Sequence, residues 1–222
     1  MSTLKVGEIK HENFTGTTQL KLDNSGQLGI GKTPGVLLDV NADAKINSIS
    51  IGKGANSVAG NTVLGESALD ASVSGGDNTA IGKEALTALT SGTNNVAVGI
   101  GSLAANTTAS NNTAVGRLAL TANTTGTENT AIGPRTLDAN TTGNYNTALG
   151  SIALTASTTG GENTAIGRSS MFANTIGGQN TAVGMESLSA NTEGQFNTAI
   201  GYKALDANTT ADNNTALGHS AL

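Results

Sequence analysis

Residues 61–222 repeat one short pattern of polar and aliphatic positions every 17 residues. Each copy begins with Asn-Thr-Ala-(Ile/Val/Leu)-Gly or a close variant, and ten copies follow one another without insertion or deletion. A loop of a globular protein tolerates changes of length, whereas a coil that lies on its neighbour does not, so the constant period indicates stacked coils. We therefore expect an all-β protein, a parallel β-solenoid or β-roll of ten 17-residue coils.

The first five residues of each repeat predict a short strand that glycine closes. Counting the asparagine as position zero, position three is aliphatic in every copy, and position two is alanine in nine of the ten. Side chains alternate between the two faces of a strand, so both faces are apolar and both need a cover. We expect the aliphatic column at position three, together with the Leu or Met of position eight, to fill the coil. The predicted structural core residues at position three are Leu64, Ile81, Val98, Val115, Ile132, Leu149, Ile166, Val183, Ile200 and Leu217.

The second apolar face of this strand needs a layer that the chain does not offer. Identical chains packed about an axis would supply it, because each would present the same apolar row to the others. We therefore predict a homotrimer.

The segment from position five to position eleven is less regular. Positions five and six carry mixed charge and size, as in Pro134-Arg135, which predicts an exposed corner that tolerates substitution. The following Ala-Leu-x-Ala-Asn, as in residues 204–208, has its apolar residues spaced for a turn of helix. A second short strand, bent at its middle, is the alternative, and both remain open from the sequence.

Two polar rows run along the predicted stack. The asparagines at position zero can hydrogen-bond to one another from coil to coil, and we favour this structural role over the glycosylation that the Asn-Thr-Thr and Asn-Thr-Ala triplets also match. The threonines at position one, from Thr62 to Thr215, are interrupted only by Val96. A regular threonine row is typical of ice-binding surfaces, although threonine is also an ordinary strand residue.

The composition offers little for chemistry. Aromatic residues make up 2% and charged residues 12% of the chain, the net charge is -5, and there is no cysteine. The two histidines, His11 and His219, have no partner at a catalytic spacing, and only Gly75-Gly76-Asp77 faintly matches a calcium-binding repeat. We expect no enzyme activity, no catalytic residue, no cofactor and no metal. The acidic balance argues against nucleic acid as a partner, and no apolar stretch suggests a secretion signal or membrane insertion.

Residues 1–60 lie outside the 17-residue register and are predicted to form an N-terminal attachment or capping module, with the shaft beginning at residue 61. Residues 20–30 predict two strands around an Asn-Ser-Gly turn, and Val36, Leu38 and Val40 predict a third. Residues 48–52 predict a shortened entry coil. A solenoid has to shield its first coil, so capping is the simplest role for this module.

Several short sequence motifs of this module resemble those of a known protein family. They are Ser-Thr-Leu-Lys-Val at residues 2–6, Leu-Asp-Asn-Ser-Gly-Gln-Leu-Gly-Ile-Gly at residues 22–31, and Leu-Asp-Val-Asn at residues 38–41. They are similar to the N-terminal region of tail-fibre proteins of tailed bacteriophages, and the repeat resembles the shafts of those fibres. More distantly, the repeat is similar to the trimeric β-roll in the head of trimeric autotransporter adhesins.

The resemblance implies a structural virion fibre protein that is assembled in the host cytoplasm. Residues 1–60 would bind tail or capsid proteins of the virion, and the shaft would project a tip that binds a receptor on the host surface. The chain stops at Leu222, position eight of the tenth repeat, which suggests a longer fibre. The alternatives are the head of a bacterial trimeric surface adhesin, which would require a signal peptide and a membrane anchor, and an ice-binding solenoid.

Overall fold

The computed structural model describes residues 20–22, 28–30, 43–46 and 48–222, and the chain divides into two compact units, residues 1–44 and 45–222. In the first unit, strand β1 (Leu20–Leu22) pairs antiparallel with β2 (Leu28–Ile30), with Leu20 opposite Ile30. The two strands predicted for residues 20–30 are therefore confirmed. The turn between them and the third strand predicted at residues 36–40 lie outside the described residues.

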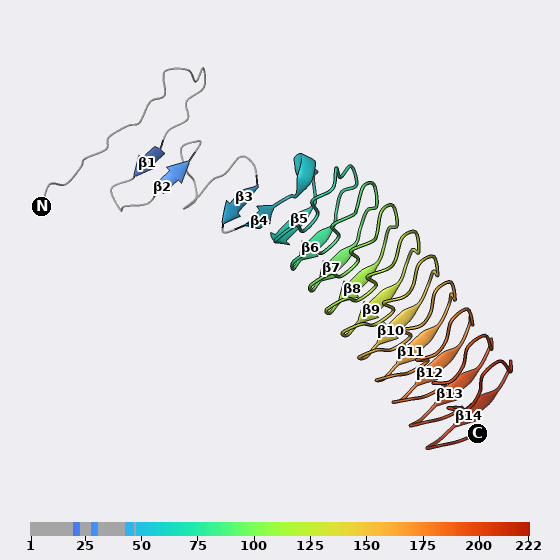
Figure 1. Ribbon diagram of the computed structural model, residues 1–222. Helices are drawn as coiled ribbons and strands as arrows, with labels where there is room; N and C mark the ends of the chain where they lie inside the picture. The colour runs from blue at the N-terminus through green and yellow to red at the C-terminus, as the bar shows by residue number, and fades with distance from the viewer. Residues whose placement is uncertain (1–19, 23–27, 31–42, 47) are drawn as a thin grey trace, which may run out of the picture. The chain divides into compact units, whose positions relative to one another are not determined.

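The second unit is a parallel β-solenoid, as predicted (Figure 1). Ten short strands lie side by side in exact repeat register, so that Thr147 lies opposite Thr164 and Leu149 opposite Ile166. Nine complete turns of 17 residues connect them. The strands are β5 (Thr62–Gly65), β6 (Thr79–Ile81), β7 (Val96–Val98), β8 (Thr113–Val115), β9 (Thr130–Ile132), β10 (Thr147–Leu149), β11 (Thr164–Ile166), β12 (Thr181–Val183), β13 (Thr198–Ile200) and β14 (Thr215–Leu217).

Hydrogen bonds between neighbouring coils continue around the whole turn and are not confined to the strands. The backbone N–H of Leu86, at position eight, donates to Ser102 O at 3.1 Å, and that of Thr124, at position twelve, donates to Thr141 O at 3.0 Å. Each bond joins equivalent parts of two coils. An inserted residue would leave several of these backbone groups unpaired, which explains the constant length of the repeat.

The segment from position five to position eleven is neither of the two structures left open by the sequence. It consists of tight turns with left-handed residues at positions six and eight, such as Arg135 (φ 54°) and Leu137 (φ 52°). A left-handed residue interrupts both a helical turn and an extended strand, so the chain reverses direction within a few residues. Asn140 N closes one such turn on Leu137 O at 3.2 Å.

The interior of each coil is narrow and holds small side chains around one leucine. Ala131 at position two and Leu137 at position eight are both fully buried, as are their counterparts in most coils. A coil of this size has no room for an aromatic ring, which accounts for the low aromatic content. The interior side of the strand accordingly takes alanine.

The prediction that the aliphatic residues of position three lie inside the coil is wrong. Because alternate side chains point to opposite faces, burying position two turns position three to the outside. Ile132 is 39% exposed and Leu149 is 43% exposed, whereas the neighbouring alanines are at 0%. The residues that this correction moves to the outer face are Leu64, Ile81, Val98, Val115, Ile132, Leu149, Ile166, Val183, Ile200 and Leu217.

The N-terminal end of the solenoid is covered by residues 48–57. Strand β3 (Ala44–Ile46) lies beside β4 (Ile49–Gly52), and β4 pairs antiparallel with β5, placing Ser50 opposite Gly65. Residues 48–52 are therefore an antiparallel strand and not the shortened parallel coil that we predicted. The 3₁₀ turn η1 (Ala55–Ser57) continues the cover, since Ala55 N donates to Leu69 O at 3.2 Å. This arrangement closes the sheet edge that β5 would otherwise expose.

Glycine at position four is required by the close approach of the next coil. Gly133 has φ 135°, and a Cβ atom built on it would lie 2.7 Å from the carbonyl carbon of Gly150. Both the backbone conformation and the contact exclude a side chain at this point. This explains why all ten repeats carry glycine there.

Candidate interaction surfaces

The asparagines of position zero form a buried ladder inside the stack, as predicted. Asn146 donates from its backbone N to Asn129 Oδ1 at 2.9 Å, and from Nδ2 to the same oxygen at 3.1 Å and to Gly160 O at 2.9 Å. The same bonds recur along the stack, and most of these side chains are fully buried. An amide nitrogen committed in this way cannot act as a glycosylation acceptor, so the structural role of this row is confirmed.

The outer face of the ten-stranded parallel part of the sheet carries two exposed or half-buried rows. One is the threonine row of position one, and the other is the aliphatic row of position three, with Leu64 at 44% and Ile200 at 38% exposed. Ten strands at a spacing of ~4.8 Å make this face about 45 Å long. An aliphatic row of that length is unusual on the surface of a soluble monomer, where large apolar patches mark interaction sites.

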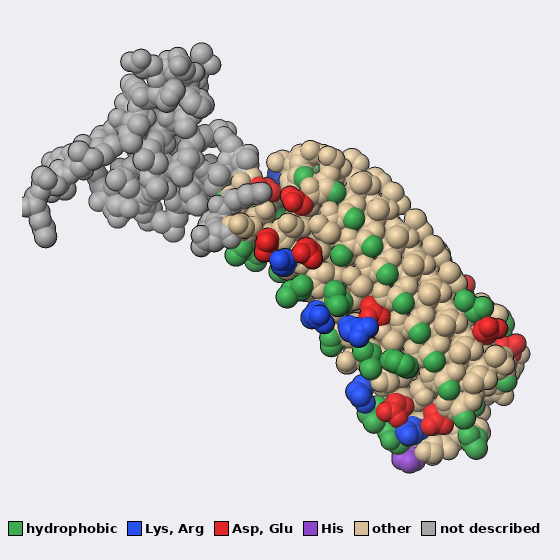
Figure 2. Space-filling view, viewed as in Figure 1, with side chains coloured by type: hydrophobic (Ala, Val, Ile, Leu, Met, Phe, Trp, Pro, Cys, Tyr) green, Lys and Arg blue, Asp and Glu red, His purple; other side chains and the backbone are tan. Residues whose placement is uncertain are grey.

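Charged side chains gather along one edge of the shaft, where positions five and six form the corner (Figure 2). Ion pairs join neighbouring coils here: Lys83 Nζ lies 3.5 Å from Glu66 Oε2, and Lys203 Nζ lies 3.5 Å from Glu186 Oε2. Water reaches these side chains and screens their charges, so the pairs contribute little to stability. The edge is a solvated surface of mixed sign.

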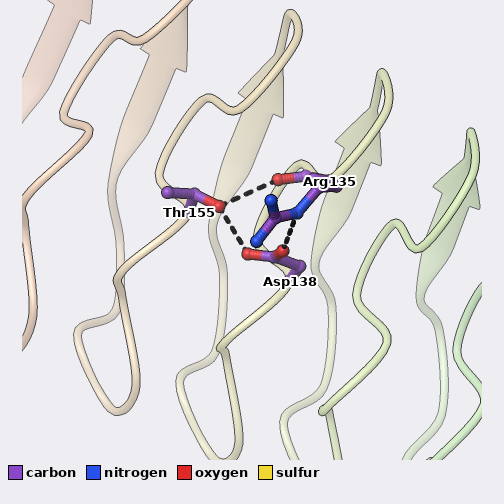
Figure 3. A network of polar contacts seen from close by, with 3 residues as sticks. All are labelled: Arg135, Asp138 and Thr155. Atoms are coloured by element: carbon purple, nitrogen blue, oxygen red, sulfur yellow. Dashed lines mark hydrogen bonds and ion pairs between the residues drawn. The ribbon is translucent and has the colours of Figure 1, made fainter.

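One polar network on this edge is more enclosed (Figure 3). Arg135 Nε donates to Asp138 Oδ2 at 2.8 Å, and the Asp138 side chain is only 12% exposed. The Thr155 hydroxyl, one coil further along, lies against Asp138 Oδ1 and 3.1 Å from Arg135 O. Arg135 is exposed, as predicted for this corner, but its guanidinium is paired with a carboxylate that is mostly buried.

At the C-terminal end of the same edge, Lys203 lies near an aromatic pair. The phenol of Tyr202, and then the carboxylate of Glu186, raise the pKa of Lys203 above its ordinary value, which keeps the lysine charged throughout the neutral range. The rings of Tyr202 and His219 are 4.9 Å apart between centroids. His219 therefore packs on a ring, and His11 lies outside the described residues.

Within the described ranges, no group of three or more His, Cys, Asp and Glu residues is placed to hold a metal ion. Nor does any helix there have the length and hydrophobicity to cross a bilayer.

Sequence reasoning missed a different set of candidate residues, the exposed aromatics. Tyr145, Phe172, Phe196 and Tyr202 all lie on the surface, between 37% and 56% exposed. The signal was present in the sequence, since each of them interrupts a position that is polar in most other repeats.

No family model, curated protein or solved structure matches this chain.

Proposed function

We propose that this chain is the shaft of a structural virion fibre, a phage tail fibre or a similar appendage. Its N-terminal residues would attach it to tail or capsid proteins, and the shaft would project a tip that binds a host receptor. The observation that supports this best is the uninterrupted aliphatic row on the outer face of an elongated solenoid. A stack of identical hydrogen-bonded coils forms a long rod, and a fibre needs such a rod to hold its tip at a distance from the particle.

The proposed fibre is a homotrimer in which the outer faces of three solenoids meet. The row of position three would converge on the threefold axis, and the threonine row would lie beside it between neighbouring chains. Each aliphatic side chain, now about 40% exposed in Ile132 and Leu149, would then be covered by its two symmetry mates. Burial of apolar surface contributes roughly 25 cal/mol per Å², and the gain repeats at every coil.

Light scattering on the purified chain tests the assembly. We expect three times the chain mass of 21.9 kDa at micromolar concentration. The virion assignment is tested separately by the genes next to the coding sequence, which should encode phage structural proteins. A bacterial surface adhesin would instead lie beside genes for export and surface display.

Ice binding is a second candidate, and the structure makes it more concrete than the sequence did. The threonine row shares the exposed outer face with the aliphatic row, at a constant spacing set by the strands. The two candidates need this face in opposite states: a fibre covers it, whereas an ice-binding protein keeps it free. A folded monomer with thermal hysteresis would favour ice binding, and a trimer without it would favour the fibre.

A further inference from the structure

Two exposed aromatic residues occupy a position that the backbone makes unfavourable for them. Tyr145 and Phe196, at position sixteen, are 56% and 52% exposed, and their φ angles are 58° and 56°. Other repeats carry Asp, Asn, Glu or Gln there, and Asn and Asp adopt left-handed backbone more readily than bulky side chains do. A ring that is neither buried nor conformationally favoured does not help the coil to fold. Such a position points to a role at the surface.

The two rings are the ends of one column of four side chains. Glu162 and Gln179 lie between them in the two intervening coils, and Gln179 Nε2 donates to Glu162 Oε2 at 3.1 Å. Coil register holds the column straight, since Glu162 N donates to Asn144 O at 2.9 Å. Three coil spacings separate the rings by about 14 Å. Along the shaft, the column thus presents an aromatic ring, a carboxylate, a side-chain amide and a second aromatic ring, in that order.

Beside this column, at position fifteen, the backbone presents unpaired donors. In three other coils a side chain of the next coil accepts this N–H: Thr93 N donates to Ser110 Oγ at 3.0 Å, and Thr127 N and Gln195 N donate to Asn144 Oδ1 and Asp212 Oδ1, both at 2.7 Å. The N–H groups of Gly76 and Ser110 have no such acceptor. Gly161 and Gly178 have no side chain that could do so.

The backbone N–H groups of Asn144 and Gly161, which these two glycines face, accordingly have no hydrogen-bond partner among the described residues, and neither has that of Gly178. The fold does not impose glycine at these two sites, because other repeats carry Thr, Ser, Asn, Gln or Asp at position fifteen. The pair of glycines leaves the donors bare between the two rings.

We propose that this surface, the column from Tyr145 to Phe196 with the bare donors beside it, binds a neutral oligosaccharide laid along the shaft. The rings suit the C–H faces of sugar rings, and the free N–H groups suit hydroxyl or acetamido oxygens. Glu162 can accept hydrogen bonds from sugar hydroxyls, and it has no ion-pair partner among the described residues, so its charge disfavours an anionic ligand. This is a lateral binding surface, separate from any receptor-binding tip and independent of the proposed fibre role.

The test measures binding of chitohexaose, cellohexaose and maltohexaose to the full chain in its native oligomeric state by isothermal titration calorimetry. The decisive variant is Tyr145→Asn with Phe196→Asn, because asparagine occupies position sixteen in three other coils, at Asn94, Asn111 and Asn213. Gly161→Asn places beside the donor of Asn144 the side chain with which Asn144 itself accepts the N–H of Thr127. Phe172→Thr removes an exposed ring at position nine and is the matched control.

We expect saturable binding of at least one hexasaccharide, a loss of at least tenfold in affinity for the double variant and for Gly161→Asn, and no change for Phe172→Thr. The proposal is overturned if no probe binds the parent, or if the double variant binds as the parent does. It is also overturned if the double variant changes the oligomeric mass, because the rings would then be a contact between subunits. A monomeric parent would contradict the trimeric fibre but would leave this binding test fully readable.

Discussion

Ser157 lies one coil beyond Asn140 at the equivalent position eleven, and neither Asn140 Oδ1 nor Ser157 Oγ has a hydrogen-bond partner. Elsewhere this position forms a second asparagine ladder: Asn191 Nδ2 donates to Asn174 Oδ1 at 2.8 Å, and Asn208 Nδ2 donates to Asn191 Oδ1 at 2.8 Å. Serine is too short to reach the asparagine above it. Ser157 therefore interrupts the asparagine ladder between Asn140 and Asn174.

Replacing Ser157 with asparagine should stabilise the protein. The new Nδ2 would donate to Asn140 Oδ1, and a buried hydrogen bond of this kind contributes about 1 kcal/mol. Gly160, three residues on, matches the Gly143 that follows Asn140, so the coil has room for the side chain. We expect a higher melting temperature by circular dichroism.

The matched control for this change is Asn191→Ser, which creates the same interruption in an intact part of the ladder. It leaves Asn174 Oδ1 without its donor and Asn208 Nδ2 without one acceptor, so we expect a loss of about 1–3 kcal/mol. If Ser157→Asn lowers the melting temperature, the position-eleven ladder is not a source of stability.

The sequence was sufficient to predict the parallel solenoid and the ladder of position zero, because both follow from strict identity of spacing and side chain. It could not show which face of the strand turns inward. Ala131 and Ile132 are both apolar, and hydrophobicity alone would place the larger one inside. The narrow interior decides the matter, since Leu137 already fills it and only a small side chain fits opposite.

The corner and the entry strand were beyond prediction for other reasons. Leucine rarely adopts left-handed backbone, so nothing in the residue type indicates φ 52° at Leu137. It is held there by burial in the core and by Leu137 N donating to Ala153 O at 3.1 Å. The antiparallel pairing of β4 with β5 could not be predicted either. An alternation of apolar residues predicts a strand, but it does not show whether that strand runs parallel or antiparallel to its neighbour.

The left-handed corner makes a prediction at Ile152. This residue has φ 52° at position six, a conformation that is costly for a β-branched side chain, and it is only half-buried. Ile152→Asn should relieve strain of about 1 kcal/mol and raise the melting temperature.

Leu154 supplies the contrast, because it has φ 51° but is fully buried at position eight. Leu154→Asn should destabilise the protein by several kcal/mol, since it removes the leucine that fills the coil and buries an amide. If both changes lower the melting temperature equally, relief of backbone strain at Ile152 does not outweigh the contacts that its side chain loses, and the prediction for position six is wrong.

The network around Asp138 predicts a coupling that a free corner would not show. Arg135→Asp removes the partner of a carboxylate that is only 12% exposed and adds a like charge beside it, so we expect a loss of about 1–2 kcal/mol. Adding Asp138→Asn should recover most of this loss, and urea unfolding of the double-mutant cycle measures the coupling. Arg117→Asp is the control, since Arg117 has no ion pair among the described residues, and its effect should stay within about 0.5 kcal/mol. Additive effects of the Arg135 and Asp138 changes would contradict the network.

The last prediction separates the interior of the coil from the proposed interface with two neighbouring residues. Ala131→Asp would bury a carboxylate with no partner inside the coil, which costs several kcal/mol or forces protonation, so the solenoid should unfold at a much lower temperature. Ile132→Asp instead places the charge on the outer face, where a single solenoid can solvate it. In a trimer three such charges would meet at one level of the axis, so we expect dissociation to the 21.9 kDa chain with the β-sheet signal retained. Light scattering and circular dichroism on both variants give the answer: unfolding of both would return position three to the interior, and a trimer that survives Ile132→Asp would mean that this row does not line the axis.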